Sequence, residues 1–270
     1  MRIRFTLLIS ILLLTSLEVV SGQVVQENAF EAGENIKLIM NYRGMGVRLD
    51  VGEAELSLNK GDSVGVRETF HASFDMKTYK FWDVFFKVRD FHESMFYADS
   101  LRPIYFHRDV NEGKYMIRNF YWWNEDNSIK AKIERQDNTP IDTLFKANAT
   151  TFDIITLIYF MRNLDYDSMK QGDELKLSFA VDRKVNNLKI VYQGREKKRI
   201  PKGGSFNTHK LAITPIDGKV FKGEQNIILW LSDDRNRLPI FMESPISMGF
   251  VQGRLGEYSN LKYPLESKIE

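Results

Sequence analysis

Apolar and charged residues alternate with a period of two along this chain, and this pattern constrains its fold more than any other feature. In SIKAKIER (128–135), three apolar side chains alternate with two lysines and a glutamate. In ELKLSFAV (174–181), four apolar residues occupy alternate positions. Alternate residues of a strand lie on one face. The pattern therefore predicts antiparallel strands with one face on a core and the other in water.

Clusters of turn-forming residues separate these strands at short intervals. They are NKGD (59–62), NEDN (124–127), QDNTP (136–140), RKVNN (183–187), PKGG (201–204) and IDGK (216–219). Short strands with frequent turns predict an antiparallel meander rather than βαβ units. About a dozen strands exceed what a flat open sheet usually holds, so we expect the sheet to curl.

One segment breaks the pattern. In TTFDIITLIYFMRNLDY (150–166), apolar residues recur at helical spacing from Ile154 to Met161, and Thr151 or Asp153 stands where a cap would lie. Apolar flanks predict that this helix packs on or inside the sheet. The expected fold is thus mainly β, an antiparallel meander forming a twisted half-barrel or incomplete barrel with one central helix packed on it.

Two segments are unusually aromatic. KFWDVFF (80–86) suits a helical turn or a strand equally, and it stays open. KYMIRNFYWW (114–123) is apolar on both faces if it is a strand. We expect one face to join the core and the helix to cover the other. In the alternative, one face lines an apolar cavity. The ligand-binding residues that this alternative predicts are Tyr115, Tyr121, Trp122 and Trp123.

The N-terminus predicts export. MRIRFTLLISILLLTSLEVVSGQ has two arginines, then a short apolar run, then small residues that end at Gly22. This order is typical of a secretory signal peptide, here residues 1–22, cleaved near Gly22. The apolar run is too short to span a bilayer comfortably, although an uncleaved anchor is the alternative. We expect an exported protein, periplasmic or secreted.

The rest of the chain, residues 23–270, is expected to be a single β-rich domain, because no Gly/Ser-rich or Pro-rich linker divides it. Two packed halves that meet near residue 148 are the alternative. The sequence has no cysteine, which excludes disulfides and a lipid-modified cysteine. The mature chain is therefore expected to be soluble, without a transmembrane segment.

Charge gives no case for nucleic acid as a partner. The chain has 38 Lys and Arg against 36 Asp and Glu, and removal of Arg2, Arg4 and Glu18 with the signal peptide leaves 36 against 35, about +1. The basic run REKKR (195–199) is interpreted as a solvated or edge strand whose lysines discourage edge pairing.

The acidic pair Asp233 and Asp234 in WLSDDRNRLPIFMES (230–244) raises the question of catalysis. The pair lies between two apolar runs. Asp and Asn suit turns because their side chains bond nearby backbone amides. We therefore expect a hairpin whose exposed turn solvates both carboxylates and keeps them apart. Acid and base catalysis would need a cleft that separates their pKa values.

None of the four histidines has the HExxH or HxH spacing of a metal site. They are His71, His92, His107 and His209. A hairpin around DSLRP (99–103) would bring His92 and His107 together near Glu93 and Asp109, which is the one metal hypothesis available. The favoured interpretation is half-exposed strand histidines.

Other catalytic motifs are missing. GGSFN (203–207) is not the GxSxG elbow. In DYDSMKQGDE (165–174), Gly172 comes two positions too late for an EF-hand calcium loop. We therefore predict no catalytic residue, no cofactor and no metal site, and the sequence favours a binding protein over an enzyme.

Six segments, in order, resemble domain-of-unknown-function family 3108. They are FEAGENIKLIMNY (30–42), FFKVRDFHESMF (85–96), LRPIYFHRDVNEGKY (101–115), DIITLIYFMRNLDY (153–166), GGSFNTHKLAI (203–213) and LWLSDDRNRLPIFMES (229–244). The resemblance implies an exported, mainly antiparallel β protein of Gram-negative envelopes, here similar to members from the Bacteroidetes. Its outline is similar to half-barrels that carry lipids or lipoproteins in the periplasm, an analogy of fold alone. The resemblance implies no activity and no site residues.

Two functional hypotheses follow. In the first, a non-enzymatic envelope protein binds a lipid, another apolar or amphipathic ligand, or a partner protein on the concave face of the sheet. In the second, an envelope hydrolase or carbohydrate-active enzyme uses scattered carboxylates with His92 or His107. The second requires two carboxyl groups about 5–9.5 Å apart in a cleft.

Overall fold

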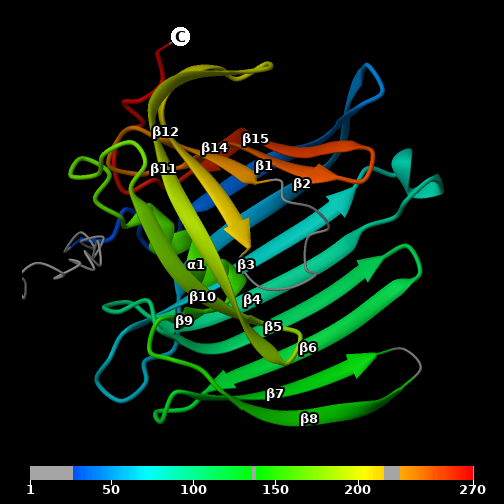
Figure 1. Ribbon diagram of the computed structural model, residues 1–270, viewed down its shortest axis with the longest axis vertical. Coiled ribbons are helices and arrows are strands. Elements are labelled where there is room, and N and C mark those ends of the chain that lie inside the picture. Colours follow the sequence, from blue (N-terminus) through cyan, green and yellow to red (C-terminus); the bar gives the residue numbers. More distant parts are fainter. Residues whose placement is uncertain (1–26, 136–137, 216–225, 270) are drawn as a thin grey trace, which may run out of the picture.

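The computed structural model describes residues 27–135, 138–215 and 226–269, and it shows one strongly curved sheet with a helix inside the curve (Figure 1). The predicted signal peptide and the predicted turn at 216–219 lie outside the described residues. The elements in chain order are β1 (Asn35–Gly44), β2 (Val47–Lys60), β3 (Thr69–Thr78), η1 (Trp82–Val84), β4 (Arg89–Tyr97), β5 (Pro103–Glu112), β6 (Tyr115–Trp123), β7 (Ser128–Arg135), β8 (Asn138–Lys146), β9 (Thr151–Phe152), α1 (Ile154–Arg162), β10 (Glu174–Val181), β11 (Lys184–Ile200), β12 (Gly204–Pro215), β13 (Ile227–Ser232), β14 (Pro239–Ile246) and β15 (Gly249–Ser259).

The described strands form a single 15-stranded sheet in the order β8-β7-β6-β5-β4-β3-β2-β1-β15-β14-β13-β12-β11-β10-β9. From β1 to β8 each strand pairs antiparallel with the next, and the same holds from β10 to β15. Pairing of β1 with β15 joins these two meanders, so Asn35 lies opposite Ser259. The sheet stays open at β8 and β9. The predicted mainly-β incomplete barrel is confirmed.

The two segments that alternate most clearly are strands with the predicted bounds, β7 and β10. In β7, Ile129, Ala131 and Ile133 are buried, as the alternation predicts. In β10, by contrast, both faces are buried toward the end of the strand. Phe179 joins one apolar cluster and Ala180 the other, because β10 lies between them.

Helix α1 begins where the sequence predicts a cap. Asp153 is the N-cap, and its carboxylate accepts hydrogen bonds from the amides of Ile155 (2.8 Å) and Thr156 (2.9 Å). Thr156 Oγ1 accepts from the Asp153 amide at 3.1 Å, which completes a capping box. The helix has nine residues, and in the described part of the chain no helix is long and apolar enough to cross a membrane.

The helix packs inside the curve of the sheet, as predicted. Tyr159 contacts Phe30 (ring centroids 4.6 Å apart) and Phe96 (5.6 Å) on the concave face. On the opposite side, Leu157 and Met161 join the cluster of β10 to β13. The helix therefore fills the concave side at the end of β4 where Phe96 lies.

A buried ion pair fixes the end of this helix. Arg162 donates to both carboxylate oxygens of Glu34 at 2.6 and 2.7 Å, and each residue is 1% exposed. The same guanidinium donates to the carbonyl oxygen of Asn236 at 3.0 and 3.2 Å. Arg162 thus ties α1 to the segment before β1 and to the β13–β14 turn.

The basic run 195–199 lies in β11, as the interpretation of an edge strand predicts. Residues 184–191 of β11 pair with β10, but 195–200 pair, among the described strands, with β12 alone. Lys198 lies 3.5 Å from the centroid of the Trp230 ring. A cation over an aromatic face is attracted to it, so the run also covers part of the core.

Candidate functional site

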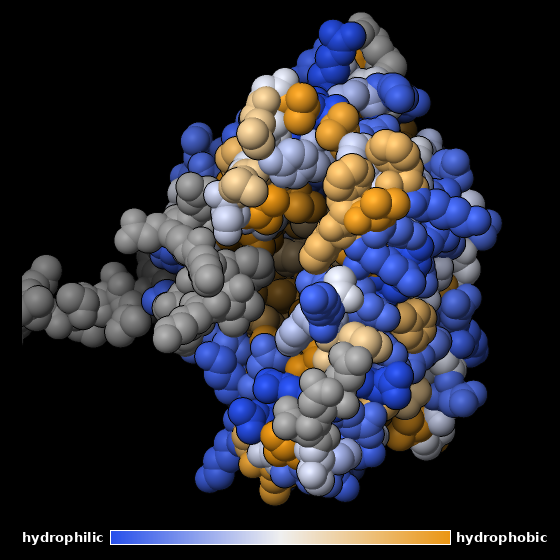
Figure 2. All heavy atoms as spheres, turned by 90° about the vertical axis from the view of Figure 1, so that its right-hand side faces the viewer, coloured by the Kyte–Doolittle hydropathy of each residue, from blue (hydrophilic) through white to orange (hydrophobic). Residues whose placement is uncertain are grey.

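An apolar cavity of about 450 Å³ opens at the end of the sheet that carries η1 and the β1–β2 and β14–β15 hairpins. Figure 2 shows the hollow on this side of the molecule, with hydrophobic walls. Six lining residues show its composition: Met40, Val51, Met76, Trp82, Phe85 and Val251. Most of the wall is apolar, and Glu112 adds a carboxyl group. The volume lies within the range of about 300–1,000 Å³ that is usual for small-molecule sites.

The segment KFWDVFF, which the sequence leaves open, forms one wall of this cavity as a 3₁₀ turn. Trp82 Nε1 donates to the carbonyl oxygen of Asp50 at 2.9 Å. Asp83 accepts from Thr78 Oγ1 at 2.5 Å and pairs with Arg89 at 2.7 Å. The Arg89 and Thr78 hydrogen bonds hold the pKa of Asp83 below its usual value. These polar contacts fix the turn while its apolar side chains stay free to face the cavity or water.

Large apolar side chains surround the mouth. Phe85 is 75% exposed and Phe81 is 70% exposed, although both pack against Trp82. Ile246 lines the cavity, and Met248, two residues later, is 71% exposed. Exposed apolar patches of this kind mark ligand, membrane or protein interaction sites.

Two acidic groups lie at or beside the cavity. Glu112 lines it, and Asp90 is buried beside Glu112. Asp90 accepts a hydrogen bond from the Asn111 amide at 2.9 Å. Burial, together with the neighbouring Glu112, raises the pKa of Asp90 to about 6. The two carboxyl groups thus interact as close neighbours rather than facing each other across an open cleft, which is the arrangement that glycoside hydrolysis requires.

Deeper in the concave face, His92, Arg108 and Asn119 form what we call the polar row. The register pairs His92 of β4 with Arg108 of β5, and Arg108 with Asn119 of β6. His92 stacks on Phe74 at 5.8 Å, and burial with the nearby Arg108 lowers the pKa of His92 to about 4. The imidazole is therefore neutral near pH 7, and Arg108 supplies the charge of the row.

The structure does not bring together the four predicted ligand-binding residues. Tyr121 and Trp123 are on the concave face of β6, and Trp122 is on the convex face, where Lys130 lies 5.9 Å from its ring. Tyr115 is 49% exposed at the start of the strand. None of the four is among the residues that line the cavity described above. Their role in binding stays a prediction.

The expectation that the helix covers the second face of β6 is wrong. Tyr121 is buried on the concave side, where α1 also lies, and its hydroxyl accepts from the Asp182 amide at 3.0 Å. Met116 and Trp122 on the convex side are 42% and 36% exposed. The curvature of the sheet places the helix inside, so the outer face of β6 remains in water.

The β4–β5 hairpin forms as predicted, but it separates His92 from His107. His107 pairs with Glu93, one position along from the His92–Arg108 pair, so His107 lies on the opposite face. On the convex face, Glu93 contacts both His71 (3.1 Å) and His107 (3.3 Å). The described residues contain no group of three or more His, Asp and Glu side chains that could hold a metal ion.

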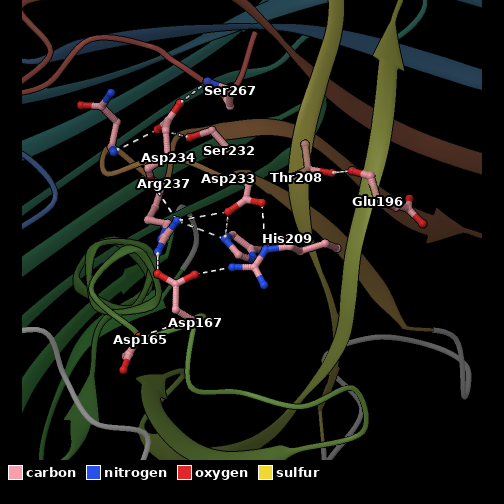
Figure 3. Close-up of polar contacts among 12 residues, drawn as sticks. Asp165, Asp167, Glu196, Thr208, His209, Ser232, Asp233, Asp234, Arg237 and Ser267 are labelled. Atoms are coloured by element: carbon pink, nitrogen blue, oxygen red, sulfur yellow. Dashed lines mark hydrogen bonds and ion pairs between the residues drawn. The ribbon is translucent and has the colours of Figure 1, made fainter. Parts of the chain in front are cut away.

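Asp233 and Asp234 lie in a hairpin, because β13 pairs antiparallel with β14 (Figure 3). The expectation that the turn solvates both carboxylates is wrong for Asp234, whereas the Asp233 side chain is 23% exposed. Asp234 is 8% exposed. Its carboxylate accepts from Ser232 Oγ (2.9 Å) and from the amides of Asn236 (3.0 Å) and Ser267 (3.0 Å). The C-terminal segment covers the turn, and the sequence gives no sign of that contact.

Asp233 belongs to a second network, centred on the buried His209 (Figure 3). His209 Nε2 lies 2.8 Å from Asp233 Oδ1, and Nδ1 lies 3.0 Å from the Tyr192 hydroxyl. Burial and the neighbouring Arg237 lower the pKa of His209 to about 4. His209 is 0% and Tyr192 2% exposed, so this Asp-His-Tyr arrangement has no access for a substrate. Its contacts instead join β11, β12 and the hairpin turn.

Comparison with known proteins identifies the family. The profile of the family described as "Protein of unknown function (DUF3108)" matches residues 38–255. The chain belongs to the DUF3108 family. The DUF3108 match contains the cavity, the polar row and the His209 network, and it confirms the resemblance inferred from the six segments. No curated protein matches the chain.

A solved structure resembles this DUF3108 protein in fold. A β-barrel-like protein of the domain of unknown function DUF1849 from Brucella abortus is similar, with a TM-score of 0.59 and 13% identity over 88% of this chain and 99% of that one. A DUF1329 family protein from Desulfovibrio piger has a TM-score of 0.21 and 14% identity over 86% of each chain. The first supports the barrel-like architecture.

Proposed function

We propose that this DUF3108 protein is an exported, non-enzymatic protein of the bacterial cell envelope that binds an apolar or amphipathic ligand in the cavity beside η1. The observation that carries the proposal is the cavity itself, a hollow of about 450 Å³ with a mostly apolar wall. Each buried methylene of a ligand contributes about 0.8 kcal/mol. A short hydrocarbon chain in such a cavity therefore binds with useful affinity.

Export is the second part of the proposal. It is supported by the sequence of residues 1–22, with its arginines, apolar run and small residues before the expected cleavage position near Gly22. The absence of cysteine fits a chain that leaves the cytoplasm without disulfides or a lipid anchor. A protein with these properties would move freely in the periplasm and meet amphipathic molecules there.

Catalysis is less well supported. Asp90 is buried and interacts with its neighbour Glu112, so the two carboxyl groups do not stand on either side of a substrate bond. In the Asp233–His209–Tyr192 arrangement, both His209 and Tyr192 are buried. A binding role uses the cavity without requiring either group to react.

Native mass spectrometry of residues 23–270 from the envelope of the host, before and after organic extraction, tests the proposal directly. A retained mass that extraction removes supports a bound ligand. A bare polypeptide mass, together with no binding of added amphiphiles, contradicts the proposal. It favours instead a protein partner at the exposed apolar side chains around the mouth of the cavity.

A matched pair of variants locates the ligand. Met76→Trp fills part of the cavity, whereas Met116→Trp makes the same change on the convex face. Binding of the neutral fluorescent probe N-phenyl-1-naphthylamine is expected to weaken about tenfold in Met76→Trp, the loss of one to two buried methylene contacts. It should stay unchanged in Met116→Trp. Equal binding by both variants would place the ligand elsewhere.

A further inference from the structure

The polar row contains buried polar atoms without hydrogen-bond partners among the described residues. They are His92 Nε2, Arg108 Nε and both the nitrogen and the oxygen of the Asn119 amide. Asn119 is 0% exposed. Leaving a buried polar group unpaired costs about 1–3 kcal/mol, so most such groups in proteins have a partner. Three adjacent residues with this property indicate a site for a polar group from outside the chain.

The charge of the row favours an oxyanion. The nearest carboxylate to Arg108 belongs to Asp182, whose Oδ1 lies 3.7 Å from Nη1, beyond hydrogen-bond distance. The Arg108 side chain is only 13% exposed. A guanidinium with an adjacent amide and a neutral imidazole offers several N–H donors at one place. This donor set matches a carboxylate or phosphate, for which arginine has suitable planar geometry.

Besides Asp182 at 3.7 Å from Arg108, two more acidic groups oppose an anion here, Asp90 and Glu112. Asp90 lies in the neighbouring row, opposite Met76 on β3. Burial already raises the pKa of Asp90 to about 6, and a bound anion would raise it further. Protonation of Asp90 would then remove its repulsion. The competing possibility, an ammonium group held by these two acids, is an outcome that the test below separates.

The position of the row relates it to the cavity. Along β3, Phe70 contacts the rings that pack on α1, Phe74 stacks on His92, and Met76 lines the cavity. Two residues of a strand span about 7 Å. The polar row therefore lies between the end filled by the helix and the apolar cavity. A head group at the row and a tail in the cavity would follow the direction of β3.

We propose that the polar row binds the oxyanion of an acidic amphiphile, a carboxylate or a phosphate, whose hydrocarbon tail occupies the apolar cavity. This inference rests on the proposed ligand-binding function and names the class of ligand. Arg108 supplies the charge, and Asn119 and His92 supply neutral hydrogen bonds to the same head group.

Displacement of N-phenyl-1-naphthylamine from residues 23–270 by ligands with one tail and different heads tests the inference. The competitors are decanoate, decyl phosphate, decanol and decylammonium. Decanoate or decyl phosphate is expected to displace the probe at a concentration about tenfold below that of decanol, the effect of one charge-assisted hydrogen bond. Which of the two is stronger distinguishes a fatty-acid carboxylate from a lipid phosphate.

Three variants assign the preference to the row. Arg108→Met and Asn119→Leu should lose the preference for the acidic head and keep the affinity for decanol. Arg118→Met is the matched control, because this arginine is on the convex face of the same sheet and pairs with Asp109 at 3.1 Å. Circular dichroism establishes folding of each variant. If Arg108→Met does not fold, the competitor series on the unmodified protein and on Asn119→Leu decides.

The outcomes are separable. Decanol as strong as the acidic ligands would overturn the head-group inference and leave ligand binding intact. Decylammonium as the strongest competitor would overturn it in favour of Asp90 and Glu112. No displacement by any of the four would contradict the proposed function itself. An unchanged preference in both Arg108→Met and Asn119→Leu would remove the site from the polar row.

Discussion

Replacement of Glu34 by glutamine is expected to destabilise the fold by about 3–5 kcal/mol, the usual cost of removing one partner of a buried ion pair. Glu34 and Arg162 are each 1% exposed, and the pair is bidentate at 2.6 and 2.7 Å. The neutral amide can accept one hydrogen bond but leaves the guanidinium without a counter-charge. For a chain of this size, about 2–4 °C per kcal/mol converts this cost to a fall in Tm of about 6–20 °C.

Thermal and urea unfolding followed by circular dichroism at pH 7 measures this effect. The double variant Glu34→Leu with Arg162→Met should recover most of the lost stability, because apolar replacement of a whole buried pair is often neutral. Glu174→Gln is the matched control, since its partner Lys189 lies at a similar 2.9 Å but the two side chains are 46% and 35% exposed. Exposed pairs contribute about 0–1 kcal/mol. A Glu34→Gln cost as small as that of the control would refute the reasoning.

Three further outcomes follow from the buried polar groups. The folded protein raises the pKa of Asp90 from 3.8 to about 6, so ionisation of this carboxyl group lowers stability as pH rises from about 4 to 6. Asp90→Asn should therefore raise the free energy of unfolding at pH 7.5 by up to about 3 kcal/mol and change it little at pH 4. Urea unfolding at both pH values measures the difference. The pKa of His209 is lowered from 6.5 to about 4, so stability is lost as pH falls from 6.5 to 4. This loss amounts to up to about 3 kcal/mol in the free energy of unfolding, and His209→Gln should remove most of it. An equally steep dependence of the free energy of unfolding on pH in the variant would contradict this. Asp234→Ala removes acceptors of three hydrogen bonds and should cost about 2–4 kcal/mol, with faster hydrogen exchange at the Ser267 amide; unchanged exchange there would mean that another contact holds the C-terminal segment.

The sequence predicts the local elements well because their signals are local. Period-two alternation over 128–135 and 174–181 corresponds to β7 and β10, since each strand has at least one face on the core. The helix and its Asp153 cap follow from helical spacing and from the position of an acidic side chain before the first turn. Both kinds of signal depend on residues close together in the chain.

The candidate site is not predictable in the same way because long-range pairing builds it. The cavity needs β1 beside β15, a contact between the two ends of the fold that no periodicity encodes. The sequence KFWDVFF leaves its secondary structure open because its aromatic residues are partly exposed, so they follow neither a strand nor a helix pattern. For the polar row, the sequence offers one signal, the alternation of side chains between the two faces of the β4–β5 hairpin. Because His92 pairs with Arg108 on one face, His107, the neighbour of Arg108, must lie on the other.

The same curvature that places α1 inside the sheet explains why an unfilled cavity remains beside it. The helix has nine residues, about 14 Å at 1.5 Å per residue, whereas β3 has ten residues and spans about 33 Å. Arg162, bound to Glu34 and the Asn236 carbonyl oxygen, fixes the helix at the end of the concave face where Phe96 lies. The other end must therefore be closed by side chains of the hairpins and η1 or by a ligand. Because η1 has its aromatic rings partly in water, the protein leaves that end accessible, and the length mismatch between helix and strand becomes the physical basis of the cavity.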